Sequence, residues 1–284
     1  MMNKKSTFLA ALTLAFMSIA ANAQLKVPAP SPTQTLEQNF ALSSIKIEYS
    51  RPSVKGRVIF GDVVPFGKTW RTGANSSTKV TFGDDVKVEG NALAAGTYAL
   101  YTIPNKDSWD IMFYKDATLG GNVADYKQEN EVLRIKAKPS ALANKVETFT
   151  INVGDITPST ANIELNWEQT RVAFSVTADI DTRIMKNIEA SVEGDNRPYF
   201  QAAGYFYDNN KDLNKALAWV NKAIEQNPKG FYIVHLKAKI QMKLKNYKEA
   251  ITTAEQSIAL SKEAKNDDYV AMNEKLIAEA KKAK

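Results

Sequence analysis

Residues 64–75 (VPFGKTWRTGAN) carry the most distinctive set of side chains in the sequence. Trp70, Arg71 and Asn75 place an indole, a guanidinium and an amide within six residues, beside a glycine that can adopt positive φ. An indole face and a guanidinium together suit a sugar-like or anionic group. The same residues also fit a structural role, in which Trp70 fills the core and Arg71 satisfies buried carbonyls.

Two further residues, which precede this segment in the sequence, extend the candidate ligand site. Arg57 adds a second guanidinium and Asp62 a carboxylate, both in a stretch without the periodicity of a strand. Long connections on a β scaffold are where binding residues often lie. We therefore expect a site for a saccharide or a small anionic ligand, formed by Arg57, Asp62, Trp70, Arg71 and Asn75.

An enzyme acting on envelope carbohydrate is the alternative, with Arg57, Arg71 and Asp62 as its working groups. It requires Asp62, Arg71 and another carboxylate to line one pocket, and it loses support if Arg71 is buried against carbonyls. Carboxylate pairs about 5–9 Å apart can also hydrolyse glycosides. Three pairs are adjacent enough in the sequence, although turn formation explains each of them better: Asp84 with Asp85, Asp107 with Asp110, and Glu129 with Glu131.

Other catalytic machinery is restricted by composition. The chain has no cysteine and a single histidine, His235. Catalytic triads in the N-terminal part and histidine-rich zinc sites therefore lack their side chains. We predict no catalytic residue, no metal and no cofactor, and the sequence favours a non-enzymatic protein.

The candidate ligand site lies in a part of the sequence that is predicted to form strands, so strands must position its residues. Apolar residues alternate with polar ones along most of residues 34–180, as in Ile45, Ile47 and Tyr49. Turn signals such as Pro104–Asp107 separate these runs at intervals typical of an antiparallel sandwich or barrel. Two stretches interrupt the pattern, at residues 57–70 and 117–130, and we expect long connections there.

Helices follow from about residue 181. Thr182 is positioned to cap a first helix that Gly194–Asn196 would end. Beyond it the chain repeats with a period of 34 residues: Ala216 is followed by Ala250, and Ala223 by Ser257. A final helix is expected after Asn266 or Asp267.

This repeat resembles the tetratricopeptide repeat. Small and aromatic residues match its motif in the first copy, namely Gly204, Tyr207, Ala216, Ala223 and Pro228. The second copy, from Phe231 to about Ala264, departs from the motif at Lys237 and Gln241. The resemblance implies stacked helix pairs with a concave groove that binds a protein or peptide partner. It places in that groove Tyr205, Asn209, His235 and Lys239.

Several motifs occur together in the N-terminal part: Tyr49–Pro52, Gly56–Arg57, Phe60–Gly61, residues 70–75 and Leu93–Tyr98. Taken together, they resemble the family called domain of unknown function 2911, found in exported bacterial proteins. The resemblance implies an exported β domain but no activity. The expected fold is thus α+β and multidomain, with an antiparallel β-sandwich or barrel-like domain followed by a tetratricopeptide-like α-helical tail.

The N-terminus predicts export. Lys4 and Lys5 precede a short apolar run, and Ala21-Asn22-Ala23 fits a cleavage site. We expect a signal peptide at residues 1–23, a proline-rich linker at 24–33, the β domain at 34–180 and the helical tail at 181–284. The absence of cysteine favours a periplasmic or secreted protein of a Gram-negative bacterium.

The net charge of +6 does not indicate a nucleic-acid partner. Residues 25–186 hold 19 basic and 18 acidic side chains, and residues 187–284 hold 16 and 13. Neither segment has the clustered basic face that phosphate contacts require. No stretch is apolar for long enough to form a stable membrane span.

Overall fold

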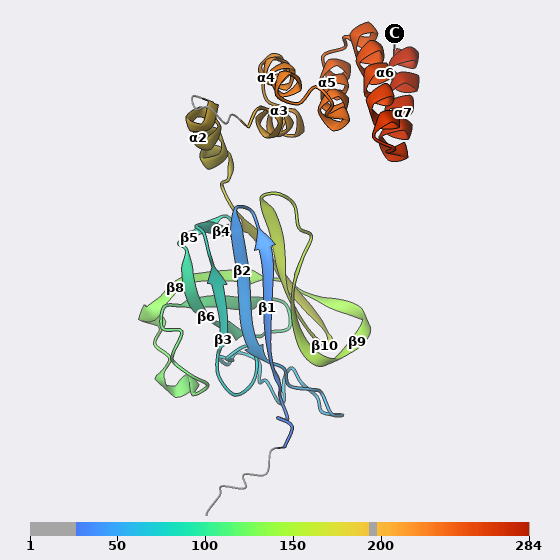
Figure 1. The fold of residues 1–284 in the computed structure, drawn as a ribbon. Helices are drawn as coiled ribbons and strands as arrows, with labels where there is room; N and C mark the ends of the chain where they lie inside the picture. Colours follow the sequence, from blue (N-terminus) through green and yellow to red (C-terminus); the bar gives the residue numbers. More distant parts are fainter. Residues whose placement is uncertain (1–26, 193–197, 284) are drawn as a thin grey trace, which may run out of the picture. The chain divides into compact units, whose positions relative to one another are not determined.

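The computed structural model describes residues 27–192 and 198–283 of the chain. It divides into a β unit that ends at Asp179 and a helical unit that begins at Ile180 (Figure 1). The expected signal peptide at 1–23, residues 24–26 of the expected linker and the expected turn at Gly194–Asn196 lie outside the described residues. No helix within the described ranges is both long and apolar enough to cross a membrane.

The described part of the β unit contains ten strands. They are β1 (Thr33–Phe40), β2 (Ser43–Ser50), β3 (Thr78–Phe82), β4 (Val86–Val88), β5 (Asn91–Leu93), β6 (Gly96–Ile103), β7 (Trp109–Tyr114), β8 (Glu131–Ala137), β9 (Pro139–Gly154) and β10 (Thr160–Thr177). Two 3₁₀ turns, η1 (Val123–Asp125) and η2 (Gln128–Asn130), lie between β7 and β8.

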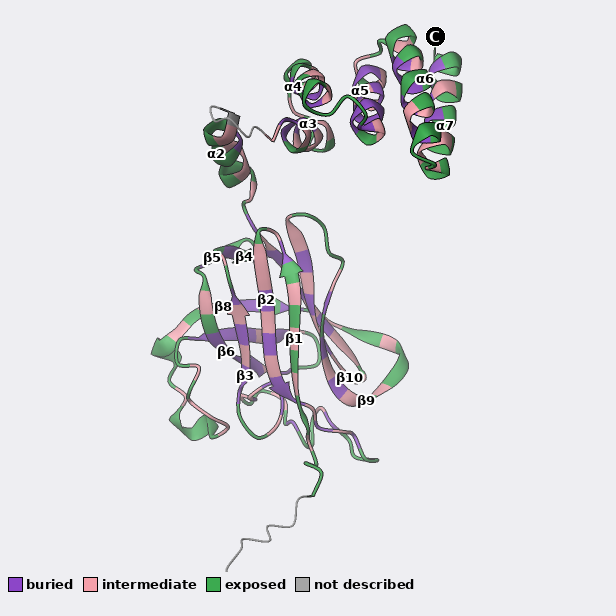
Figure 2. Ribbon diagram, viewed as in Figure 1, coloured by how far each residue is buried: buried purple, intermediate pink, exposed green. Residues whose placement is uncertain are grey.

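These strands form two antiparallel sheets. One has the order β1-β2-β3-β6-β7-β8 and the other β5-β4-β10-β9. Alternation along β2 buries Ile45, Ile47 and Tyr49, while the residues between them are less buried (Figure 2). The antiparallel β fold predicted from the period of two is confirmed, and its two sheets make a sandwich.

Two strands, β1 and β5, have no counterpart in the sequence pattern. β1 begins at Thr33, in the last residue of the expected linker, and pairs along its length with β2. It is an edge strand with the polar sequence TQTLEQNF, so it lacks the apolar alternation of a strand with a buried face. Pairing with β2 through backbone hydrogen bonds is what makes it a strand.

The long connection between β2 and β3 joins the two sheets. The backbone N–H of Val54 donates to the carbonyl of Glu147 (2.8 Å), and that of Phe149 donates to the carbonyl of Pro52 (2.8 Å). An antiparallel bridge pairs Ser53 with Thr148. The segment therefore leaves the six-stranded sheet and pairs with β9 of the four-stranded sheet.

The helical unit consists of α2 (Asp181–Val192), α3 (Tyr199–Asp208), α4 (Leu213–Gln226), α5 (Phe231–Lys243), α6 (Tyr247–Glu263) and α7 (Asp267–Ala283). The helix pairs α3/α4 and α5/α6 coincide with the two copies of the 34-residue repeat, and α7 follows as a single helix. Asn266 caps α7 by accepting from the N–H of Tyr269 (3.1 Å). Thr182 was expected as a cap, but it lies inside α2, since the first turn bonds to the carbonyl of Ile180.

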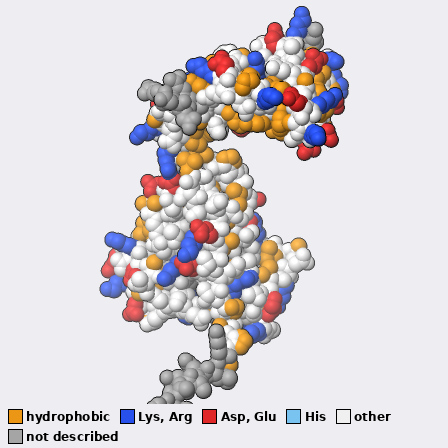
Figure 3. Space-filling view, in the orientation of Figure 1, with side chains coloured by type: hydrophobic (Ala, Val, Ile, Leu, Met, Phe, Trp, Pro, Cys, Tyr) orange, Lys and Arg blue, Asp and Glu red, His pale blue; other side chains and the backbone are white. Residues whose placement is uncertain are grey.

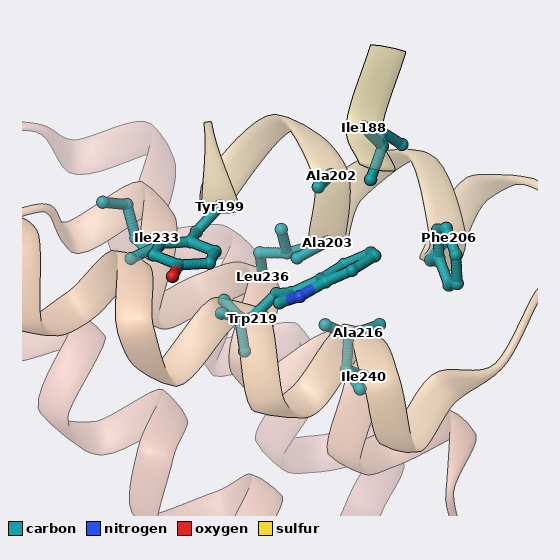
Figure 4. Close-up of a cluster of buried hydrophobic side chains, with 12 residues drawn as sticks. Ile188, Tyr199, Ala202, Ala203, Phe206, Ala216, Trp219, Ile233, Leu236 and Ile240 are labelled. Carbon is teal, nitrogen blue, oxygen red and sulfur yellow. The ribbon is translucent and has the colours of Figure 1, made fainter. Parts of the chain in front are cut away.

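Small residues let the repeat helices pack closely. Ala203 of α3 and Ala216 of α4 are fully buried beside the indole of Trp219. Figure 4 shows this indole among side chains of α3, α4 and α5. Ile188 of α2 belongs to the same cluster, so α2 packs against the helical core.

Candidate functional site

A groove runs along the first helices of the repeats and α7. Two neighbouring cavities of about 500 and 520 Å³ form it, and both are lined by His235, Lys239 and Met272. The first extends towards Tyr207 and the second towards Tyr205. Because residues of α3, α5 and α7 line both cavities, the groove is continuous across three helices.

Apolar side chains are open to solvent in this groove. Tyr232 is 36% exposed and Met272 46%, and both line the second cavity. They are the large hydrophobic residues of the described helical unit with the greatest exposure. An exposed apolar surface with a polar rim is typical of a site that binds another molecule.

Lysines flank an aromatic ring at one end of the groove. The Nζ atoms of Lys239 and Lys243 lie 4.6 and 4.5 Å from the centre of the Tyr207 ring. Lys243 also donates to the Tyr207 carbonyl (2.8 Å). With Lys275 on α7, three lysines line the first cavity against one acidic residue, Glu279. This end of the groove is therefore positively charged.

His235 forms part of the groove wall but is itself 6% exposed. Its Nδ1 lies 2.8 Å from Oδ1 of Asn273, which is fully buried. Burial, above all, and the charge of Lys239 lower the pKa of the imidazole, and together they outweigh the opposing hydrogen bond to Asn273. The histidine is thus neutral at pH 7 and belongs to the packing between helices as well as to the groove.

Tyr205 and Asn209, the other residues expected in the groove, have different positions. Tyr205 lines the second cavity, and its hydroxyl donates to Asp181 of α2 (2.6 Å). Asn209 follows the end of α3, and its amide donates to the carbonyl of Tyr205 (2.9 Å). It is not among the residues lining either cavity.

Trp70 of the β unit is 9% exposed and lies in an aromatic core. Its ring stacks on Trp167 at 5.8 Å and meets Trp109 edge to face at 6.3 Å. The indole N–H donates to the Gly73 carbonyl (3.0 Å). This arrangement corresponds to the structural alternative left open by the sequence, in which Trp70 fills the core.

Backbone carbonyls hold both guanidinium groups of the expected ligand site. Arg57 donates to the carbonyls of Val54 (3.1 Å) and Ser53 (2.7 Å). Arg71 donates to the carbonyl of Asn75 (2.9 Å). Asp62 lies exposed in the neighbouring turn. The enzymatic alternative requires the opposite arrangement, with Arg71 turned into a pocket.

Asn75 lines a separate pocket of about 250 Å³ beside β1, β2 and β3. Hydroxyl groups dominate its wall, which is lined by Thr33, Glu48, Tyr49, Ser50, Asn75, Ser76, Ser77 and Lys79. The Asn75 amide bonds to the Ser50 hydroxyl (3.3 Å). Trp70, Arg71, Arg57 and Asp62 do not line this pocket, so the five expected residues are not brought together there.

One member of each acidic pair that could be catalytic is engaged elsewhere. Arg134 bonds to both Glu131 (2.6 Å) and Asp110 (2.9 Å). Burial raises the pKa of Glu131, but hydrogen bonds from Arg134 and Tyr126 outweigh it and hold that pKa below its usual range. Asp85 accepts from the N–H of Ala95 (2.8 Å) in a turn. No cluster of His, Cys, Asp or Glu suited to a metal occurs among the residues that the structure describes.

Several groove residues were missed by the sequence reasoning. They are Tyr207, Tyr232, Met242, Lys243, Tyr269, Met272 and Lys275. The signal for one of them was present, because Lys239 and Lys243 follow His235 at steps of four along one helix face. The residues of α7 carried no repeat motif, and only the packing of that helix brings them to the groove.

The comparisons with known proteins agree with this two-part architecture. Residues 31–176 match the family model described as Protein of unknown function (DUF2911). Residues 187–257 match the model described as Anaphase-promoting complex, cyclosome, subunit 3. Both resemblances expected from the sequence, to the first family and to a helical repeat, are confirmed. Among curated proteins, none matches the chain significantly.

Proposed function

This chain belongs to the DUF2911 family of proteins of unknown function, and we propose that it is a binding protein whose helical groove holds a partner segment. The observation that carries the proposal is the groove on α3, α5 and α7, with Tyr232 and Met272 exposed in its wall. Burying such side chains against a partner would remove apolar surface from water.

An extended peptide segment is the occupant that the groove fits best. The two cavities follow one another along three helices, and lysines, tyrosines and apolar side chains line them. Three lysines at one end complement carboxylate groups, so we expect Asp, Glu or a C-terminal carboxylate there. Tyr205, Tyr232 and Tyr269 at the other end suit an apolar side chain.

The same proposal places the protein in the bacterial cell envelope, with no enzymatic activity. Export is supported by the pattern of a signal peptide at residues 1–23, and the absence of cysteine favours a bacterial envelope over a eukaryotic secretory route. A non-enzymatic role is supported by the carbonyl bonds of Arg57 and Arg71. In this role, the β unit is a scaffold that carries the helical unit.

A selection of random short peptides displayed on phage, with the full chain as bait, tests the groove. Lys275→Glu reverses a groove charge and should weaken the selected acidic peptides about ten-fold, as a charge reversal against a carboxylate does. Lys262→Glu on α6 reverses an exposed lysine outside the groove and is the matched control. Equal affinities for the two variants, or a selection that yields no peptide, would refute the groove.

A further inference from the structure

A series of buried hydrogen bonds behind the groove determines which ring nitrogen of His235 carries the hydrogen. Nδ2 of Asn273 donates to the backbone carbonyl of Tyr269 (2.7 Å), which can only accept. The amide nitrogen must therefore be on that side, and Oδ1 faces the imidazole. Since Oδ1 also only accepts, the hydrogen in the 2.8 Å contact belongs to Nδ1 of His235.

The same series of hydrogen bonds continues through Ser257 to the carbonyl of Phe231. Nδ2 of Asn273 also donates to Oγ of Ser257 (2.9 Å), and the Ser257 hydroxyl donates to the Phe231 carbonyl (2.8 Å). Asn273 and Ser257 are both fully buried. Donor and acceptor are thus determined for each hydrogen bond in the series that runs from His235 through Asn273 and Ser257 to Phe231. The series connects α5, α6 and α7.

A neutral imidazole with its hydrogen on Nδ1 leaves Nε2 as an acceptor. None of the described residues bonds to Nε2, and this atom is not among their buried side-chain atoms that lack a partner. It therefore reaches the groove, whose two cavities His235 lines. The middle of the groove presents one uncharged acceptor between the lysines and the tyrosines.

We propose that Nε2 of His235 accepts a hydrogen bond from an N–H group of the bound peptide segment, with Asn273 as the positioning residue. This inference rests on the proposed function of the groove. A backbone N–H fits the site because an extended peptide offers one at every second residue on each side. The neighbouring lysines can only donate hydrogen bonds, so they cannot accept one from a peptide N–H. Nε2 of His235 can accept it.

Protonation of His235 would abolish this acceptor. The imidazolium donates from both nitrogens, so it opposes a peptide N–H. Charged residues around the two cavities are Asp208 of α3, Lys239 and Lys243 of α5, and Lys275 and Glu279 of α7, and α6 contributes the neutral Ser257. Their balance is positive, which opposes a further charge on the imidazole.

The tautomer can be measured without any ligand. His235 is the single histidine, so a long-range ¹H–¹⁵N correlation spectrum of the full chain shows one imidazole. We expect Nδ1 to be the protonated nitrogen and Nε2 the unprotonated one at about pH 7.5. The reverse assignment would overturn the proposal, because Nε2 would then donate.

The hydrogen bond is tested with a peptide from the phage selection. Its addition should shift the ¹⁵N resonance of Nε2 and leave Nδ1 nearly unchanged. His235→Leu should weaken that peptide about ten-fold, the size of one hydrogen bond. Because burial lowers the pKa of His235, the affinity of the parent chain should hold down to about pH 6.5 and fall only below it, and in His235→Leu it should fall less.

The outcomes separate this inference from the groove itself. If no peptide is selected, the proposed function fails, and the inference with it. If peptides bind but the Nε2 resonance does not move and His235→Leu binds equally well, only the inference fails. Should His235→Leu not fold by circular dichroism, the Nε2 shift in the parent chain decides.

Discussion

Nδ1 of His235 and Oδ1 of Asn273 lie 2.8 Å apart and join α5 to α7 across 38 residues of sequence. The final helix carries no repeat motif, yet this bond and the buried Leu276 and Ala280 fix it against the second repeat. Its groove residues, among them Met272 and Lys275, are positioned as a result.

Removing the amide should loosen α7. Asn273→Ala leaves His235 and the Ser257 hydroxyl without their shared partner, and we expect a loss of about 1–3 kcal/mol in the free energy of unfolding. Urea denaturation followed by far-UV circular dichroism measures it. Glu274→Ala, an exposed neighbour on the same helix, is the control and should change little. Similar losses in both variants would mean that α7 responds to helix propensity and not to the bond.

Stability of the helical unit should depend on pH through His235. In the unfolded chain the imidazole titrates near its usual pKa of about 6.5. In the folded chain burial lowers that pKa, so the unfolded state binds a proton that the folded state does not. The contribution of His235 to the free energy of unfolding should therefore be fully present above about pH 7.5. It should be lost progressively as the pH falls from about 6.5 towards the lowered pKa of the folded state.

The His235→Gln variant isolates this effect. Carboxylates of both units also titrate at low pH, and they are common to the variant and the parent chain. The difference between the two denaturation profiles should shrink as the pH falls below about 6.5. A difference that stays constant over this range would show that His235 has the same pKa in the folded and unfolded states.

Trp70→Ala should destabilise the β unit. The indole packs on Trp167, Trp109 and Phe149, and truncation of such a buried ring costs about 3–5 kcal/mol. Chemical denaturation followed by tryptophan fluorescence measures the loss. Lys68→Ala, exposed in the same segment, is the control. If Trp70→Ala is as stable as this control, the aromatic core does not depend on Trp70.

Gly121→Ala should disturb the contact between the two long connections of the β unit. A Cβ atom at this position would overlap the carbonyl oxygen of Asn75 and the Nη1 atom of Arg71. Overpacking of this kind typically costs about 1–3 kcal/mol. Thermal unfolding monitored by circular dichroism measures the cost, and Ser76→Ala, an exposed neighbour of Asn75, serves as the control. An unchanged midpoint would mean that the residue 117–130 connection can move away from Arg71.

The sequence alone determined the architecture, because strands and repeat helices bury their own periodic faces. Alternation of Ile45, Ile47 and Tyr49 requires a sheet with one buried face, and the spacing from Ala216 to Ala250 requires equivalent helices. Both inferences need only neighbouring residues. The edge strand β1 escaped this reasoning since its pairing is made by the backbone and leaves little pattern in its side chains.

Only the tertiary structure decided what the distinctive side chains do. An indole and a guanidinium next to each other in sequence suit a ligand or a core equally, and the choice depends on rings contributed by distant strands. Trp167 and Trp109 make Trp70 a core residue. In the same way, the direction of the hydrogen bonds at His235 depends on Asn273, 38 residues away. Local patterns determine which face is buried, whereas the partners of a polar group come from packing between elements that are distant in sequence.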